Sequence, residues 1–206
     1  MLENRNIMKR VIPDLFSSYD VNPIDDYPSQ LFKCLGDASF NTKANKKIVV
    51  LTPGVFNSAY FEHSYLAQQM GVELVEASDL YVSRSNNVLM KTINGPKKVD
   101  VIYRRIDDVF VDPKVWRKDS KLGIPGIYNA WKNKKIAIVN APGSGVADDK
   151  AVYAFVPKMI KFFLQEKPII SQVKTYVCAF KKDLDYVTNN IDKLVLKPVN
   201  ESGGYG

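Results

Sequence analysis

Hydrophobic residues follow two different spacings in the first half of the chain. Four consecutive apolar residues, Ile48–Leu51, are typical of a strand that is buried on both faces. Between Tyr60 and Met70 the apolar positions fall instead near the spacing of a helix, and Gly71 is suited to end that helix. A further apolar run follows at Val72–Val75. The order strand, helix, strand predicts a parallel β-α-β unit.

The alternation of strand and helix patterns continues to residue 167. Asn94-Gly95-Pro96 is a turn sequence, so the runs on either side, Val88–Thr92 and Val99–Tyr103, are predicted to form a hairpin. The elements expected after it are a short helix near Tyr128–Trp131, a strand over Ile136–Val139 and a long amphipathic helix over Lys150–Leu164. Strands that alternate with helices favour an open, Rossmann-like α/β sheet.

The two ends of the chain have other patterns. Residues 1–46 are rich in proline and in Asp and Asn, which is typical of a connector, with short amphipathic or helix-like stretches at Ile7–Leu15 and Leu31–Leu35. After Pro168 the expected elements are a short strand around Tyr176, a helix from Asp183 to Ile191 and a final strand over Leu194–Val199. We therefore predict three domains: a connector at 1–46, the α/β sheet at 47–167 and the start of a small α+β unit at 168–206.

Composition supports a folded, globular chain. Of 206 residues, 46% are hydrophobic and 11% aromatic, which is enough for a packed core. The net charge of +7 arises largely from short lysine clusters at predicted element ends. These clusters do not form the single basic stripe of a nucleic-acid-binding protein, whereas a polyanionic substrate such as ATP accounts for some of the excess.

Cysteine usage and hydropathy bear on the compartment. Cys34 and Cys178 belong to no metal-binding or paired motif, so we expect reduced, buried thiols and a cytoplasmic protein. No stretch approaches the ~20 apolar residues of a membrane span, and the N-terminal residues do not resemble a signal peptide. The spacing of His, Cys, Asp and Glu predicts no metal site.

The final residues carry the strongest chemical signal. Lys197 lies on the last predicted strand and is followed by Ser202-Gly203-Gly204-Tyr205-Gly206. A lysine supplies a point charge, and glycines let backbone N–H groups approach phosphate oxygens, so this order is suited to hold a triphosphate. It is not a P-loop, in which the glycines come first. The alternative is an ordinary hairpin turn with an exposed lysine.

A second glycine-rich connection precedes the long helix. Gly143 and Gly145 match the first two glycines of a dinucleotide fingerprint, but Asp148 replaces the third and Asp149 follows it. Two carboxylates beside a helix N-terminus repel a pyrophosphate, which argues against a dinucleotide site. The alternative is that Asp148 or Asp149 caps the helix that begins at Lys150.

Two further clusters are candidates for substrate binding. Arg104, Arg105, Asp107 and Asp108 lie at the end of a predicted strand, where ligands of open α/β sheets collect. Arginines bind carboxylates with forked hydrogen bonds, and carboxylates accept from an amine. Neighbouring strand residues face opposite ways, so we expect one of each pair to enter a site. The alternative is a surface salt-bridge network.

The other cluster lies in the first turns of the β-α-β helix, which we expect to be capped by Asn57 or Ser58. It contains Asn57, Glu62 and His63 next to a helix N-terminus that is suited to anions. Adjacent helical residues point about 100° apart, so Glu62 and His63 do not form a catalytic dyad by themselves. A lone histidine is more often structural than catalytic.

Six segments together resemble the circularly permuted ATP-grasp type two family, relatives of the glutathionylspermidine synthase group. They are Leu51–Gly54, Asn57–His63, Gln69–Glu76, Val101–Asp108, Gly145–Lys150 and Lys197–Gly206, and they extend in order over the chain. The resemblance implies a pre-ATP-grasp sheet followed by the start of an ATP-binding subdomain. It also implies ligation through an acyl phosphate, with ATP and Mg²⁺ as cofactors and small-molecule or peptide-like carboxylate and amine substrates.

The resemblance also assigns residues. Lys150, Lys197, Ser202, Gly203, Gly204 and Gly206 match ATP-binding positions, and the candidates Asn57, Glu62, His63, Arg104, Arg105, Asp107 and Asp108 match signature positions of the preceding domain. Family members look longer and carry metal-binding carboxylates outside the matched region. We therefore expect a piece of a ligase that is inactive alone, or alternatively a non-catalytic α/β binding module that a partner completes. Whether the chain forms a homo-oligomer is left open, and we expect it to bind neither nucleic acid nor a membrane.

Overall fold

The computed structural model describes residues 2–200. The chain forms two compact units, Met1–Ala141 and Pro142–Gly206, and each is described by itself. We call them the first and the second unit. The domain limits expected from the sequence, at residues 46 and 167, stay a prediction.

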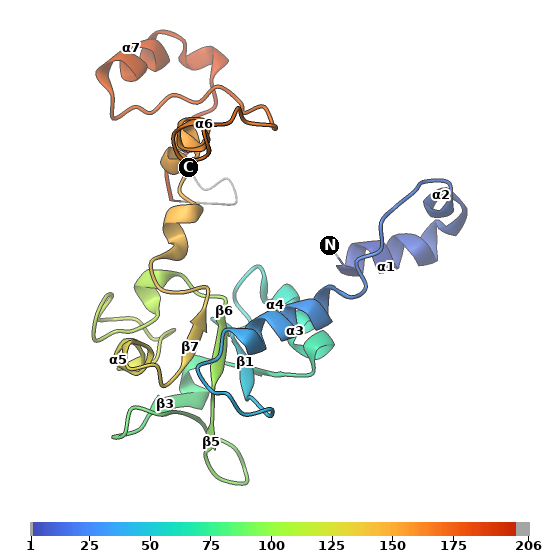
Figure 1. Ribbon diagram of the computed structural model, residues 1–206, viewed down its shortest axis with the longest axis vertical. Coiled ribbons are helices and arrows are strands. Elements are labelled where there is room, and N and C mark those ends of the chain that lie inside the picture. Colours follow the sequence, from blue (N-terminus) through green and yellow to red (C-terminus); the bar gives the residue numbers. More distant parts are fainter. Residues whose placement is uncertain (1, 201–206) are drawn as a thin grey trace. The chain divides into compact units, whose positions relative to one another are not determined.

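A four-stranded parallel sheet forms the centre of the first unit, in the order β2-β1-β6-β7 (Figure 1). Its strands are β1 (Ile48–Leu51), β2 (Glu73–Val75), β6 (Val101–Arg104) and β7 (Ala137–Val139). All three strand pairs are parallel, which confirms the open α/β sheet. The chain leaves β1 toward β2 on one side and returns to β6 on the other. The winding therefore reverses between β1 and β6, and ligands of such sheets bind beyond the carboxyl ends at this point.

Helices cover both faces of the sheet because side chains alternate along each strand. Val49 and Leu51 of β1 pack in a cluster with residues of α5 (Ile127–Lys132). Ile48 and Val50 pack in a second cluster with α3 (Tyr27–Asp37) and α4 (Tyr60–Met70). Figure 1 shows α3 and α4 on one side of the sheet and α5 on the other. This burial on both faces explains the continuous apolar run of β1.

The predicted hairpin is present with a different second strand. A small antiparallel sheet contains β3 (Leu80–Val82), β4 (Val88–Met90) and β5 (Lys97–Lys98). Val99 still donates to Val88 (2.9 Å), but Asp100 donates to Lys47 beside the parallel sheet (2.8 Å). The run Val99–Tyr103 is therefore shared between two sheets, and its assignment to the hairpin alone is wrong.

The helix α4 ends as expected and begins later than expected. Gly71 adopts the left-handed conformation (φ +67°) and closes the helix. The predicted cap by Asn57 or Ser58 is wrong, because the helix begins at Tyr60 and no side chain caps it. The Asn57 side chain instead accepts a hydrogen bond from the Ala59 N–H (2.9 Å), which stabilises a turn before the helix.

The N-terminal residues contain more helix than a connector would. The helices α1 (Leu2–Val11) and α2 (Pro13–Ser17) precede α3, which is longer than the stretch expected at Leu31–Leu35. Single 3₁₀ turns, η1 (Ala77–Asp79) and η2 (Asp108–Phe110), complete the first unit. The helical spacing of α1 outweighs the proline and Asx signals that surround it.

The described part of the second unit is helical. It contains η3 (Ser144–Ala147), α6 (Lys150–Leu164), α7 (Lys181–Asn189) and η4 (Ile191–Lys193). Both limits of α6 agree with the prediction. The strands expected around Tyr176 and over Leu194–Val199 are wrong, because residues 142–200 contain no strand. The Tyr176 ring stacks on Tyr186 of α7 instead.

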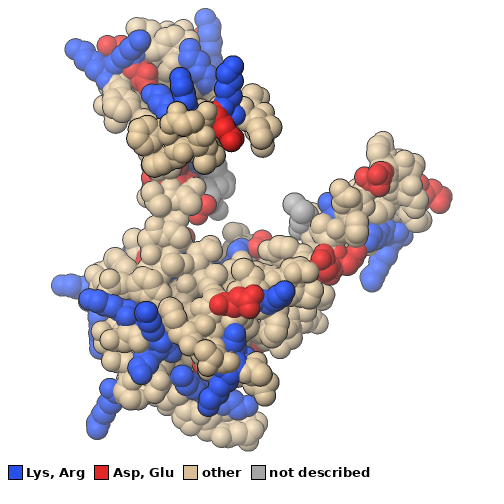
Figure 2. Space-filling model, viewed as in Figure 1, with Lys and Arg blue, Asp and Glu red and all other residues tan. Residues whose placement is uncertain are grey.

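Three further expectations concern the surface. Cys34 and Cys178 are free thiols as expected, but both are exposed, so their predicted burial is wrong. Within residues 2–200, no helix has the length and apolar character needed to cross a membrane. On the face shown in Figure 2, basic side chains form separate groups on both units.

Candidate functional site

The reversal of winding between β1 and β6 brings two loops together. Thr52 follows β1 and its N–H donates to Val75 of β2 (2.9 Å), while the Arg105 N–H donates to Leu51 of β1 (2.8 Å). Both loops therefore begin at the carboxyl edge of the sheet. The N-terminal turn of α4, which carries Glu62 and His63, contacts both loops at the same edge.

Arg105 is the cation at this position. Its guanidinium forms an ion pair with Glu62, donates to the Tyr103 hydroxyl (3.2 Å) and lies 5.8 Å from the centre of the Tyr103 ring. The Arg105 side chain is 27% exposed and that of Glu62 is 55% exposed. The pair is thus fixed on one side and open to solvent on the other. On the open side, Arg105 can bind a carboxylate and Glu62 can bind an ammonium group.

His63 lies next to this pair and is buried (2% exposed). Its Nδ1 is 2.9 Å from the Thr52 hydroxyl, which also accepts a hydrogen bond from the Gly54 N–H (3.2 Å). Burial, with a smaller contribution from Arg105, lowers the pKa of His63 below its usual 6.5. The neutral imidazole therefore links the loop after β1 to α4. This is the structural role that the sequence analysis favours for a lone histidine.

Gly54 allows a carboxylate to approach that loop. Its φ of +101° is rare for other residues, and a Cβ at this position would lie 3.0 Å from the Glu76 carboxylate. Glu76 follows β2, so the carboxyl ends of three neighbouring strands contribute to this edge. In the sequence, Gly54 and Glu76 are marked only by the Thr-Pro-Gly turn and as the last residues of two segments of the family resemblance.

Tyr27 at the start of α3 is a further member of the cluster. Tyr27 is 47% exposed, and its partial desolvation raises the pKa of the phenol; Tyr103 raises it further, Arg105 lowers it and Glu62 raises it. The neutral phenol is therefore within electrostatic reach of the pair Arg105–Glu62. The site residues predicted from the sequence did not include Tyr27, Tyr103 or Thr52, although Thr52 and Tyr103 lie in segments of the family resemblance. The position of Tyr103 next to two arginines was an available signal, whereas nothing in the sequence indicates where α3 packs.

Arg104 faces away from Arg105, as the alternation of strand residues requires. Its side chain is only 8% exposed and forms an ion pair with Asp108. It also donates to the carbonyl groups of Asn140 (2.7 Å), Ile106 (2.6 Å) and Ala141 (3.3 Å). Arg104 therefore connects the loop after β6 to the loop after β7 and stabilises both.

The other candidates of the first unit lie outside the cluster. Asp108 is engaged by Arg104, and Asp107 is exposed and caps η2 without a side-chain hydrogen bond. Asn57 is exposed in the turn before α4. Of the seven predicted substrate residues, the structure brings Glu62, His63 and Arg105 together.

The second unit brings two predicted ATP-binding segments together. The N–H of Lys150, the first residue of α6, donates to the carbonyl of Val199 (3.1 Å), two residues after Lys197. Lys197 is exposed. The remaining predicted residues, Ser202, Gly203, Gly204 and Gly206, lie outside the described residues.

The second glycine-rich connection was interpreted either as a dinucleotide site or as a loop in which Asp148 or Asp149 caps the helix. The contacts of Asp149 distinguish the two. Its carboxylate accepts from the N–H groups of Ala151 (2.8 Å) and Val152 (3.2 Å), so it caps α6. A pyrophosphate at this helix N-terminus would need the same N–H groups. The capping alternative is confirmed, and the resemblance to a dinucleotide fingerprint stops at the glycines.

A magnesium site is not found in the described part of the chain. Residues 2–200 contain no group of three or more His, Cys, Asp and Glu side chains that could hold a metal ion.

Comparison with known proteins gives a consistent result. The family described as circularly permuted ATP-grasp type 2 matches residues 1–206. An uncharacterized protein of Synechocystis sp. is 50% identical over 206 residues, 100% of this chain and 43% of that protein. An uncharacterized protein of Mycobacterium tuberculosis is also 50% identical, over 100% of this chain and 37% of that protein.

A more distant relative carries the name of an enzyme. A protein of Frankia casuarinae named "Putative glutamate--cysteine ligase 2-2" is 38% identical over 208 residues, 100% of this chain and 24% of that protein. The chain thus spans less than half the length of each of these three relatives. Since the family match extends over all 206 residues, the chain belongs to the circularly permuted ATP-grasp type 2 family.

Proposed function

We propose that the chain is part of an ATP-dependent carboxylate–amine ligase. In this reaction a carboxylate oxygen attacks the γ-phosphorus of ATP, which gives an acyl phosphate and ADP. An amine then attacks the acyl carbon, phosphate leaves, and the amine loses a proton, so that an amide is formed. A cytoplasmic location follows from the proposal, because the reaction consumes ATP.

The observation that carries this proposal is the hydrogen bond from the Lys150 N–H to the Val199 carbonyl. The family resemblance assigns Lys150 and Lys197 to the nucleotide phosphates, although they are far apart in the sequence. Because of this hydrogen bond, the segments that carry them lie side by side within one unit. Lysines act as point charges for phosphates, so the arrangement is suited to a triphosphate.

The pair Arg105–Glu62 is the proposed substrate contact. An amino acid carries a carboxylate and an ammonium group, and the open side of this ion pair presents a guanidinium and a carboxylate. The name of the Frankia relative, a glutamate–cysteine ligase, refers to substrates with these groups. We therefore assign the class of amino-acid or peptide-like substrates to this site. The Tyr103 hydroxyl accepts a hydrogen bond from Arg105 beside this pair (3.2 Å).

Magnesium neutralises phosphate charge in reactions of this kind. The described residues contain no cluster of three or more His, Cys, Asp and Glu side chains that could hold it. In our proposal the metal ligands therefore belong to segments that the longer relatives possess outside the matched region, and the chain alone is inactive.

Trapping of the acyl phosphate tests the proposal without knowledge of the amine. A hybrid in which this chain replaces the matched segment of the Synechocystis relative is incubated with ATP, Mg²⁺, hydroxylamine and single amino acids, L-glutamate first. The expected result is a hydroxamate that requires ATP and that Arg105→Ala reduces about tenfold or more. If an intact hybrid forms no hydroxamate from any amino acid or peptide supplied, the ligase proposal is wrong.

A further inference from the structure

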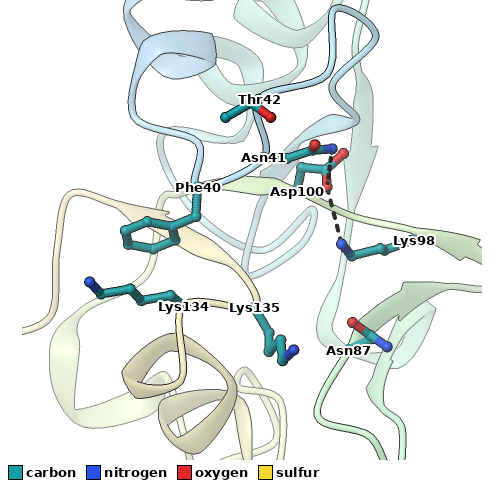
Figure 3. Close-up of a pocket in the computed structure, with 8 residues that line it drawn as sticks. All are labelled: Phe40, Asn41, Thr42, Asn87, Lys98, Asp100, Lys134 and Lys135. Atoms are coloured by element: carbon teal, nitrogen blue, oxygen red, sulfur yellow. Dashed lines mark hydrogen bonds and ion pairs between the residues drawn. The ribbon is translucent and has the colours of Figure 1, made fainter.

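A polar cavity lies at the edge of the parallel sheet opposite to the candidate site. Its volume is about 270 Å³, and its lining includes Asp100 directly before β6 and Lys135 shortly before β7 (Figure 3). The candidate site described above lies at the carboxyl ends of the strands, whereas this cavity lies at their amino ends. It contains none of the residues that the family resemblance assigns to ATP or substrate.

Positive charge is in excess around this cavity. Three lysines, Lys98, Lys134 and Lys135, line it together with a single carboxylate, Asp100. Asp100 is buried, and its oxygens accept from the Asn41 side chain (3.0 Å) and the Lys47 N–H (2.9 Å). Its remaining partner is the Lys98 ammonium at 3.6 Å.

The Asp100 charge is thus compensated by Lys98. Within residues 2–200, Lys134 and Lys135 have no ion pair. In Figure 3, Lys134 lies on the same side of the cavity as the Phe40 ring, and Asn87 and Lys98 lie on the other. Two uncompensated cations therefore border a small hollow.

The backbone fixes these two lysines in an unusual way. The Lys134 N–H donates to the Trp131 carbonyl and the Lys135 N–H to the Ala130 carbonyl, both at 2.9 Å. This is the hydrogen-bond pattern of a Schellman motif at the end of α5, in which the residue at the Lys134 position is normally glycine.

Lys134 has a φ of +56°, a conformation that residues with a side chain rarely adopt. The backbone alone would favour glycine at this position. A side chain held in an unfavourable conformation next to a cavity suggests that the side chain itself has a role.

We propose that this cavity binds the phosphate group of a small molecule, with Lys134 and Lys135 as its cationic ligands. Lysine is the point-charge partner of phosphate, while planar carboxylates are more often held by the fork of arginine, and no arginine lines this cavity. The Thr42 hydroxyl is available as a hydrogen-bond donor on the same lining. The volume lies just below the range of ~300–1,000 Å³ that is usual for drug-sized ligands.

Calorimetric titration of the 206-residue chain with sodium pyrophosphate, at constant ionic strength set with NaCl, tests this site. The expected result is saturable binding of one pyrophosphate per chain. Lys134→Gly and Lys135→Gln should each weaken binding about tenfold. Lys121→Gln, which removes an exposed lysine that does not line the cavity, should leave the affinity unchanged.

Two control variants assign the binding to this cavity. Lys134→Gly suits the left-handed backbone, so its melting temperature should be no lower than that of the unchanged chain, and weaker binding by this variant is then not due to unfolding. Lys197→Ala should leave binding unchanged, because Lys197 belongs to the proposed ATP site in the second unit. Absence of saturable binding, or an equal loss in Lys121→Gln or Lys197→Ala, would overturn the proposal.

Discussion

Two neighbouring arginines illustrate how residue position decides role. Arg104 and Arg105 have the same chemistry and adjacent places at the end of β6, but the strand turns them in opposite directions. Arg104 is almost enclosed and binds three carbonyl groups and Asp108, whereas Arg105 is partly open beside Glu62. The first therefore contributes to stability, whereas the second is the proposed ligand contact.

Substitution of each arginine by lysine tests this division, because lysine keeps the charge and loses the fork. Arg104→Lys should lower the free energy of unfolding of the first unit by about 2–4 kcal/mol, since several hydrogen bonds to a charged group are lost. Arg105→Lys should lower it by less than about 1 kcal/mol. Urea unfolding followed by tryptophan fluorescence measures this unit, because Trp116 and Trp131 both belong to it. Equal losses in the two variants would contradict the assignment.

His63 predicts a dependence of stability on pH. Its pKa is lowered in the folded chain, so the unfolded chain binds the proton more readily. The contribution of His63 is therefore complete above pH ~6.5 and is lost as pH falls below this value, by at most about 1.4 kcal/mol per pH unit. His63 is the sole histidine of the sequence.

The same fluorescence experiment at pH ~7.5, ~6.5 and ~5.5 measures this slope on both sides of the ordinary histidine pKa. In His63→Gln the difference between the two lower pH values should be smaller, even if the variant is less stable at every pH. An unchanged slope in His63→Gln would show that other groups cause the pH dependence.

At the scale of elements, the start of α6 provides a matched pair of carboxylates. Asp149 accepts from two N–H groups of the first turn, while the neighbouring Asp148 precedes the cap and is exposed. Asp149→Ala should destabilise α6 by about 1 kcal/mol. Asp148→Ala makes the same change in charge and should cost only a few tenths of a kcal/mol, from the helix dipole.

Hydrogen exchange of the α6 amide groups measures this difference, because the second unit contains no tryptophan. Faster exchange through the helix is expected for Asp149→Ala alone. Similar exchange in both variants would mean that charge, and not the cap geometry, stabilises the helix start.

Elements that depend on a local sequence pattern could be predicted well. The run Ile48–Leu51, the stop at Gly71 and both limits of α6 depend on local pattern and agree with the structure. Residues Val99–Tyr103 were misassigned because their hydrogen bonds go to two different sheets. The strand expected over Leu194–Val199 failed for a related reason, since pairing is a property of two segments and a sequence run reveals only one of them.

The candidate site, like the fold, could be predicted only in part. Strand-end position and charge identified Arg105, while the position in the first turns of the β-α-β helix and the family resemblance identified Glu62. Tyr27 could not be found, because its approach to Arg105 depends on how α3 packs on the sheet. Arg104 was included since a sequence cannot show which of two adjacent strand residues faces a site.

At the scale of the whole molecule, the chain belongs to a family in which the three relatives described above are more than twice its length. Its first unit carries the proposed substrate contact at Arg105 and Glu62. Its second unit carries the two segments assigned to nucleotide phosphates. The central claim of our account is that these segments bind ATP when the rest of a longer protein is present.

A calorimetric titration with ATP in the presence of Mg²⁺ tests this claim most directly. The proteins compared are the chain alone, the hybrid with the Synechocystis relative, and that hybrid with Lys197→Ala or with Lys193→Ala, a nearby exposed lysine, as control. We predict binding by the hybrid and its Lys193→Ala variant, at least tenfold weaker binding with Lys197→Ala, and none by the chain alone. Absence of binding by a folded hybrid, or equal binding with Lys197→Ala, would contradict the account and favour a non-catalytic binding module.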